Sequence, residues 1–189
     1  MLVSRLPRER AAGVFVGVIL LAGAVASAEE VYKATLTSPR RLGKKTAVLT
    51  VTIKQSATEE DAAKLRKILN EQGSNAAIEA LQRNDWGVAK ITGGPSSVIT
   101  YVRVFPGQNG SRVVIITAEP LYFPEDAPQP GAASPTRAVG LIQLEVTSKG
   151  KGRGTMAAAV KFRTTDEGVF QVEASRAEPI DLVDVQREK

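Results

Sequence analysis

Two runs of the sequence hold side chains that could bind an anion. In the first, Gly150, Gly152 and Gly154 alternate with Lys151 and Arg153. Glycine amides and two cations could cradle a phosphate or a carboxylate, so Lys151, Gly152 and Arg153 form a candidate anion-binding site. The pattern G-x-x-x-x-G-K-[ST] is not met, which argues against a nucleotide-binding loop. The alternative is a hairpin turn whose glycines supply positive φ and whose cations keep a sheet edge soluble.

The second run is the basic group Arg40, Arg41, Lys44 and Lys45. These side chains could touch an anionic surface such as lipid headgroups or a polysaccharide. The alternative is an ordinary solvated turn between two strands.

Catalytic chemistry has few candidates. The acidic neighbours Asp166–Glu167 and Glu125–Asp126 could act as a glycosidase pair only if they faced a bond about 5–9.5 Å apart, which adjacency does not imply. The chain contains no His and no Cys. This removes the usual general base near neutral pH, the Ser-His and Cys-His nucleophile pairs and the usual metal ligands. We therefore expect no enzymatic activity, no metal and no cofactor.

Aromatic side chains offer a possible apolar site. Tyr101, Phe105, Tyr122 and Phe123, with Trp86, could line a pocket for an apolar ligand. The alternative is plain core packing, to which large aromatic side chains contribute most.

The start of the chain has the order of a secretory signal peptide. Three arginines precede an uncharged apolar run over 11–25, and Ala26-Ser27-Ala28 supplies the small residues of a cleavage site. We expect residues 1–28 to be removed and 29–189 to be exported to the periplasm or beyond. The alternative is an uncleaved anchor, because the apolar span is near the lower limit of about 17–25 residues for crossing a bilayer.

Removal of this segment also lowers the basicity of the chain. It takes away three arginines and one glutamate, so the formal net charge falls from +5 to +3. A protein that binds nucleic acid usually has a concentrated basic face, whereas here acidic and basic residues are interspersed along the sequence. We expect no nucleic-acid partner, and no transmembrane span once the signal peptide is cleaved.

The remaining residues must position any site, and most of them alternate with period 2. Ala47, Leu49, Val51 and Ile53 share one face of a predicted strand over 46–54. Similar patterns predict strands at 31–38, 88–91, 98–105, 112–118, 141–147, 156–162, 170–174 and 180–185. The run 149–154 is expected to turn, and the tail 186–189 is expected to fray.

Between the second and third strands the period becomes helical. Thr58 can cap a helix, and the acids that follow it favour the positive end of the helix dipole. Gly73 is placed to end this helix in a left-handed conformation, and Ser74 or Asn75 can cap a second, shorter helix. An αα-hairpin is therefore expected over about 58–84.

Residues 124–136 contain four prolines and no apolar periodicity, which predicts an exposed loop with disorder as the favoured state. Together these elements predict one α+β domain over 29–189. It should be a mainly antiparallel sheet of eight or nine strands, forming a sandwich or a partly closed barrel, with an inserted helical hairpin.

The order of the pieces resembles a family of small exported bacterial proteins of unknown function. The resemblance lies in Thr58–Ala62, Leu65, Leu69, Gly73, Ala77, Leu81, Gly87-Val88, Arg112–Phe123, Gly140–Leu144 and Lys151–Gly154. It departs from the family at Glu119, where other members carry Arg. The resemblance implies export and a shared fold and supplies no activity.

The function expected from these observations is a non-catalytic binding or structural module of the cell envelope, whose partner is an envelope protein or an apolar ligand. The alternative is a carrier that holds a small apolar ligand in a barrel-like pocket. A carboxylate enzyme is a third hypothesis, and it requires two acids facing each other across a cleft.

Overall fold

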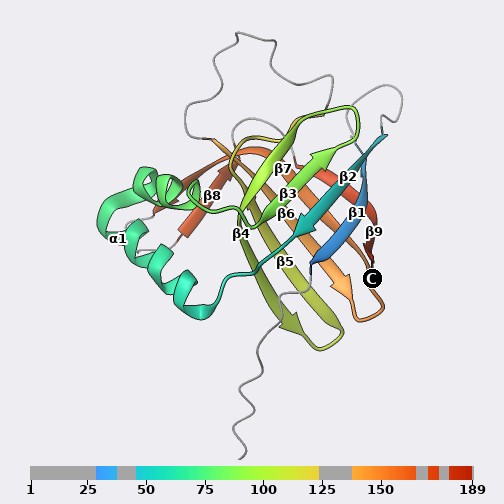
Figure 1. The fold of residues 1–189 in the computed structure, drawn as a ribbon, viewed down its shortest axis with the longest axis horizontal. Helices are drawn as coiled ribbons and strands as arrows, with labels where there is room; N and C mark the ends of the chain where they lie inside the picture. Colours follow the sequence, from blue (N-terminus) through green and yellow to red (C-terminus); the bar gives the residue numbers. More distant parts are fainter. Residues whose placement is uncertain (1–28, 38–45, 124–137, 165–169, 175–178, 189) are drawn as a thin grey trace, which may run out of the picture.

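The computed structural model describes residues 29–37, 46–123, 138–164, 170–174 and 179–188 (Figure 1). For Ala159, 161–164 and 170–174 it describes the backbone alone. The predicted signal peptide, the basic group at 40–45, the proline-rich loop 124–136 and both acidic pairs lie outside the described residues.

Nine strands and one helix make up the described chain. Their bounds are β1 Glu30–Thr37, β2 Thr46–Ile53, α1 Glu59–Leu81, β3 Gly87–Ile91, β4 Ser96–Gly107, β5 Gly110–Thr117, β6 Val139–Thr147, β7 Lys151–Thr164, β8 Phe170–Ala174 and β9 Ile180–Glu188. The strands that sequence periodicity predicts are all present, within a few residues at each end.

The strands form one sheet that closes on itself. Its order is β6-β5-β4-β3-β2-β1-β9-β7-β8, and β6 also pairs with β7. Every pairing is antiparallel, from the β1–β2 pair around to the β6–β7 pair. The closed ring therefore has eight strands, while β8 pairs with the far half of β7. The predicted antiparallel α+β fold is confirmed, and its form is a closed barrel.

The barrel interior is filled by side chains. Of the four inward-facing residues predicted for β2, Leu49, Val51 and Ile53 are at most 5% exposed, and Ala47 is partly buried. They pack with aliphatic side chains from β1, β3, β4, β5, β6, β7 and β9 in one cluster. An eight-stranded barrel is just wide enough for its own side chains to fill it.

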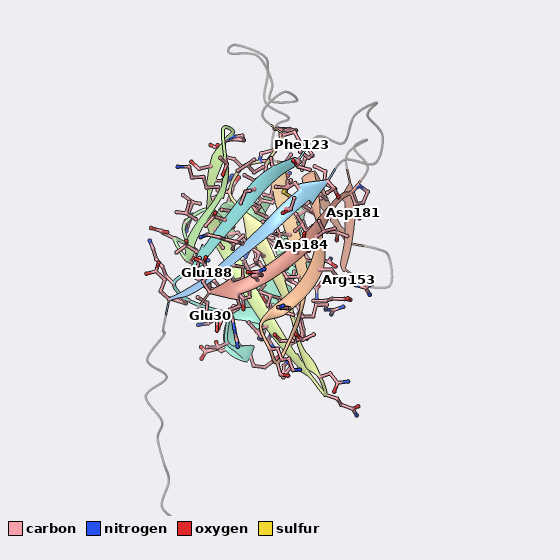
Figure 2. All side chains as sticks on the ribbon, turned by 90° about the vertical axis from the view of Figure 1, so that its right-hand side faces the viewer. Glu30, Phe123, Arg153, Asp181, Asp184 and Glu188 are labelled. Carbon is pink, nitrogen blue, oxygen red and sulfur yellow. The ribbon has the colours of Figure 1, made fainter. Side chains whose placement is uncertain are left out.

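The two ends of the barrel are distinct. Phe123 lies at the end opposite Glu30 and Glu188 (Figure 2). At the Glu30 end the hydroxyl of Tyr32 donates a 2.6 Å hydrogen bond to the Glu30 carboxylate. Burial, and then this bond, raise the pKa of Tyr32 well above its usual range.

A second apolar cluster lies outside the barrel, under α1. Ile78 and Leu81 of the helix pack on Ile116 of β5, Leu141 of β6 and Val160 of β7. The helix therefore covers the outer face of β5 to β7, and the sheet there is apolar on both of its faces.

The predicted αα-hairpin is not shown: α1 is one helical element that is bent (Figure 1). The bend is at Gly73, where φ is +82° and ψ is −179°. The left-handed φ expected there is present. The helix resumes at the next residue, so no turn separates two antiparallel helices.

The turn expected over 149–154 is shorter in the structure and ends at Gly150. Gly150 has φ +78°, and Lys151 onward belongs to β7. A Cβ on Gly152 would overlap the carbonyl oxygen of Glu145, and one on Gly154 would overlap that of Gln143. These two glycines serve the close approach of β7 to β6, and neither supplies positive φ.

The tail expected to fray is also ordered as far as Glu188. It belongs to β9, whose partner is β1, with Val31 opposite Glu188 and Lys33 opposite Gln186. Lys33 Nζ lies 2.6 Å from the Glu188 carboxylate. Pairing with a strand from the other end of the chain is not visible in local sequence.

Candidate functional site

The outer face of β4, β5 and β6 arranges its side chains in rows. Antiparallel register places outward residues of neighbouring strands opposite one another. The three rows are Tyr101–Ile116–Leu141, Arg103–Val114–Gln143 and Phe105–Arg112–Glu145. The first row is apolar, the second is mixed and the third is dominated by charge.

The first half of α1 lies over these rows and leaves a groove of about 550 Å³ beside them. We call it the α1 groove. Its apolar lining comes from α1 (Ala62, Leu65 and Leu69) and from the sheet (Tyr101, Phe105, Val114, Ile116 and Leu141). Its polar lining consists of Glu59, Arg66, Arg103, Arg112 and Gln143. Ligand sites combine apolar walls with a few polar groups in this way.

The start of the helix is fixed by a capping box. The Thr58 hydroxyl accepts a 3.2 Å hydrogen bond from the Asp61 amide, and the Asp61 carboxylate accepts a 2.9 Å bond from the Thr58 amide. These two bonds satisfy backbone donors that the first turn cannot pair internally. The cap that the sequence predicts at Thr58 is therefore present, and it sets where α1 leaves the barrel.

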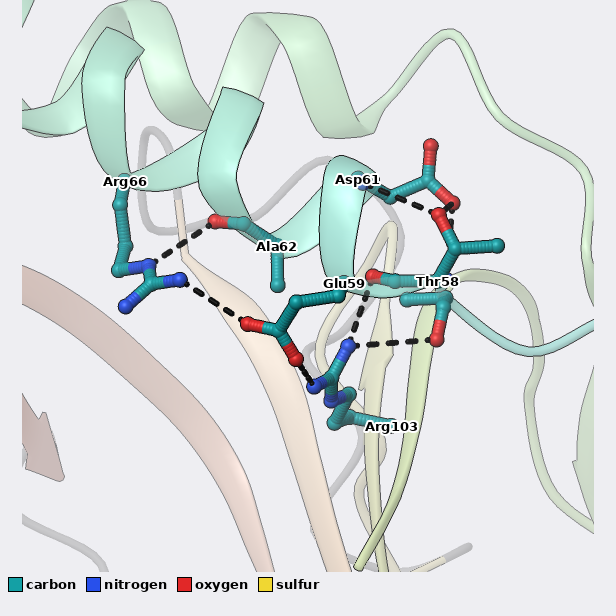
Figure 3. Close-up of polar contacts among 7 residues, drawn as sticks. Thr58, Glu59, Asp61, Ala62, Arg66 and Arg103 are labelled. Carbon is teal, nitrogen blue, oxygen red and sulfur yellow. Dashed lines mark hydrogen bonds and ion pairs between the residues drawn. The ribbon is translucent and has the colours of Figure 1, made fainter.

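Arg103 connects this helix start to the barrel (Figure 3). Its guanidinium donates a 2.7 Å bond to the Thr58 carbonyl and a further bond to the Glu59 carboxylate. Arg66, about two helical turns further on, also binds the Glu59 carboxylate at 3.1 Å. We call Thr58, Glu59, Asp61, Arg66 and Arg103 the helix-start cluster. Three of its members, Glu59, Arg66 and Arg103, line the α1 groove.

The cluster shifts the pKa of both its acids downward. The hydrogen bond from Arg103 is the main cause of the lowered pKa of Glu59, and hydrogen bonds from Thr58 lower the pKa of Asp61. Both side chains are close to fully solvated. They therefore stay ionised throughout the neutral range, and neither is suited to act as a general acid there.

Arg112 has a different environment from the other two arginines of the groove. Its guanidinium carbon lies 4.9 Å from the centre of the Phe105 ring, and that of Arg103 lies 5.7 Å from the same ring. Phe105 is 40% exposed. Within the described part of the chain, Arg112 makes no ion pair and no side-chain hydrogen bond, so its N–H donors face solvent at the mouth of the groove.

The structure divides the predicted aromatic pocket. Tyr101 and Phe105 line the α1 groove, and burial raises the pKa of Tyr101. Trp86 stacks on Tyr101 with ring centres 5.6 Å apart but belongs to the core. Phe123 is 7% exposed in the barrel core, and Tyr122 is half-buried next to it. Neither Tyr122 nor Phe123 lines the groove.

The predicted anion-binding residues lie on the barrel wall. Lys151, Gly152 and Arg153 are in β7, between β6 and β9, so their backbone amides lie in a paired strand and not in a loop. Arg153 Nε donates to the Glu145 carboxylate at 3.2 Å. The Lys151 side chain is exposed. An anion cradle of loop amides is therefore not formed by these three residues.

Sequence reasoning missed Arg66, Arg103 and Arg112. One signal was available: in the strand 112–118, Arg112 alternates out of phase with Val113 and Ile115 and so faces outward. The position of Arg66 over the sheet, by contrast, depends on where α1 docks, which the sequence pattern does not show.

The chemistry of the described residues favours binding. Among them no group of three metal-ligating side chains occurs. Glu59, the one acid among the described residues that line the groove, is bound to arginine, and Asp61 serves the helix cap. What the site offers is an apolar surface, one unpaired guanidinium and one amide, that of Gln143.

Comparison with protein-family models, with curated proteins and with solved structures finds no match to the chain. Within the described ranges, no helix has the length and apolar character needed to cross a bilayer.

Proposed function

We propose that the protein is a non-catalytic binding module whose ligand site is the α1 groove. The observation that carries this proposal is the groove itself: about 550 Å³, roofed by a helix, floored by aliphatic and aromatic side chains and edged by polar groups. Sites for small molecules typically measure about 300–1,000 Å³ and have this composition.

The lining of the α1 groove is not simply a loosely packed part of the hydrophobic core. Leu65, Tyr101 and Val114 are only partly buried, although they face the second apolar cluster. Further along the helix, Ile78 and Leu81 close tightly on the same sheet. The helix therefore touches the barrel with its second half and leaves apolar surface uncovered beneath its first half.

The proposal places the ligand outside the barrel. A carrier with an internal pocket is the alternative expected from the sequence, but the inward side chains of β1 to β7 and β9 pack into one continuous buried cluster. The groove supplies the apolar space that such a carrier would need. Export to the cell envelope, with residues 1–28 as a signal peptide, remains part of this proposal.

Binding of an uncharged apolar fluorophore tests the proposal. N-phenyl-1-naphthylamine should bind the purified protein with enhanced emission. Val114→Trp should weaken this binding at least tenfold, because the indole would occupy the floor of the groove. The matched control is Val88→Trp, since Val88 is 39% exposed on the outer face of β3 and does not line the groove.

Comparison of the two variants shows whether the α1 groove is the ligand site. Binding that is lost in Val114→Trp and kept in Val88→Trp supports the groove as the site. Equal binding by both variants, or no binding by the wild type, would contradict it. Thermal unfolding of each variant confirms that both proteins are folded.

A further inference from the structure

We infer that the ligand of the α1 groove is a single-chain anionic amphiphile whose acid group binds Arg112 and whose apolar chain lies under the first half of α1. This inference rests on the proposed function and adds the chemical class of the ligand. It concerns one amphiphile molecule in a groove, and not a membrane surface.

The charge of the groove is unbalanced. Three arginines and one glutamate line it, which leaves an excess of two positive charges. Glu59 binds both Arg66 and Arg103, so a single carboxylate serves two guanidinium groups. Arg103 is further engaged by the Thr58 carbonyl. Among the described residues that line the groove, Arg112 is left as the cation with free donors.

The position of Arg112 suits a headgroup. It lines the α1 groove and also two neighbouring hollows that extend over Glu145 and Arg153. It therefore stands where the groove opens to solvent. The nearest acid across the sheet is Glu145, which is opposite Arg112 in register but is paired with Arg153.

Phe105 holds the guanidinium in place. Phe105 is opposite Arg112 in register, and its ring centre lies within 6 Å of the guanidinium carbons of both Arg103 and Arg112. A cation over an aromatic face is stabilised without using its N–H donors. Arg112 is thus held by a cation–π contact while its planar fork stays available for two parallel bonds to a carboxylate or phosphate.

The groove becomes apolar away from Arg112. The row containing Arg112 and the row containing Ile116 are four residues apart along β5, a distance of about 13 Å. Val114 lies between them on the same face, and Leu65 and Leu69 face this path from α1. A ligand with a charged end and a medium-length hydrocarbon chain matches this gradient.

The test compares dodecyl ligands that differ only in their heads. Dodecanoate, dodecanol and dodecyltrimethylammonium, each below its aggregation concentration, are titrated into the protein by calorimetry. We expect dodecanoate to bind about 5- to 10-fold more tightly than dodecanol at low salt, as suits one charged hydrogen-bonded pair at a half-exposed site. The ammonium should bind most weakly.

Arg112→Gln should remove the preference for dodecanoate over dodecanol and leave dodecanol binding unchanged. Arg83→Gln is the matched control, because Arg83 is exposed beyond the end of α1 and does not line the groove. High salt should reduce the preference in the wild type and have no such effect in Arg112→Gln.

The outcomes separate this inference from the proposed function. Equal binding of dodecanol and dodecanoate would overturn the anionic headgroup and leave the groove as an apolar site. No binding of any dodecyl ligand would overturn both. Binding to phosphatidylglycerol vesicles without binding of monomeric dodecanoate would also overturn the inference, because it would show a surface contact in place of a single bound chain.

Discussion

The guanidinium of Arg103 on β4 donates a 2.7 Å hydrogen bond to the carbonyl oxygen of Thr58, the residue that caps α1. One side chain thus joins the barrel wall to the start of the helix. Because the same guanidinium binds Glu59, the distance between helix and sheet at this end of the groove is set by a polar contact. At the other end it is set by the packing of Ile78 and Leu81.

Arg103→Met should loosen the first half of α1. The Arg103 side chain is only 18% exposed, and loss of its hydrogen bond to the Thr58 carbonyl should lower the free energy of unfolding by about 1–2 kcal/mol. Amide hydrogen exchange should become faster in the first turns of α1. The control is Arg153→Met, which breaks a pair whose partners are 82% and 62% exposed. A similar loss of stability in both variants would contradict the role given to Arg103.

Gly152→Ala should severely destabilise the protein. The new methyl group would overlap the Glu145 carbonyl, and backbone atoms cannot rotate away as a side-chain end can. We expect a loss of about 3 kcal/mol in urea unfolding, at the upper end of the range for overpacking. Gly107→Ala is the matched control, since its Cβ would lie 3.5 Å from the nearest atom, in ordinary contact. Comparable stability of the two variants would show that β7 does not need to lie so close to β6.

Acid should release the start of α1 before the barrel unfolds. The folded pKa values of Glu59 and Asp61 lie below the ordinary 4.5 and 3.8, so their stabilising effect is complete above those values and is lost as the pH falls through the folded ones. Unfolding in urea at pH 6 and pH 3 should show a larger drop for the wild type than for the double variant Glu59→Gln, Asp61→Asn. An identical drop in the two proteins would rule out these carboxylates as the cause.

Asp184 should tolerate glycine and reject a β-branched residue. It lies in β9 (Figure 2), where the register against β1 and β7 shifts, and its φ is +52°. This left-handed conformation costs an L-residue about 1–2 kcal/mol, and more when the side chain is branched at Cβ. Asp184→Val should therefore lower the melting temperature by several degrees, while Asp184→Gly should leave it unchanged or raise it. The opposite ranking in a thermal scan would contradict the assigned conformation.

Local sequence patterns predicted the individual strands and the helix start better than they predicted how the sheet closes into a barrel. Alternation at Leu49, Val51 and Ile53, and the cap at Thr58, depend on neighbours in sequence, and both were read correctly. The pairing of β6 with β7 depends on Gly152 and Gly154 meeting backbone carbonyls of a different strand. Glycine in a run of cations is typical of a turn, so the sequence alone favoured the wrong element there.

The sequence predicted only part of the groove lining, again because the rest depends on contacts between distant strands. Tyr101 and Phe105 were identified as aromatic candidates, and both line it. Tyr122 and Phe123 were grouped with them because aromatic character alone does not tell which face of a barrel a side chain occupies. A register shift between Ile99 and Tyr101 moves Tyr101 onto the helix side of β4. A register shift of this kind cannot be predicted from the alternation of apolar and polar residues in the sequence.

The pairing of Val31 with Glu188 joins the two ends of the described chain. These contacts join residues that are separated by most of the sequence, so the ring cannot close during synthesis until β9 has been made. High separation of this kind predicts slow folding relative to helical proteins of the same size. It also makes the chain a good subject for circular permutation: a short linker between β9 and β1, with new ends opened in the Gln108–Asn109 turn, should preserve the barrel.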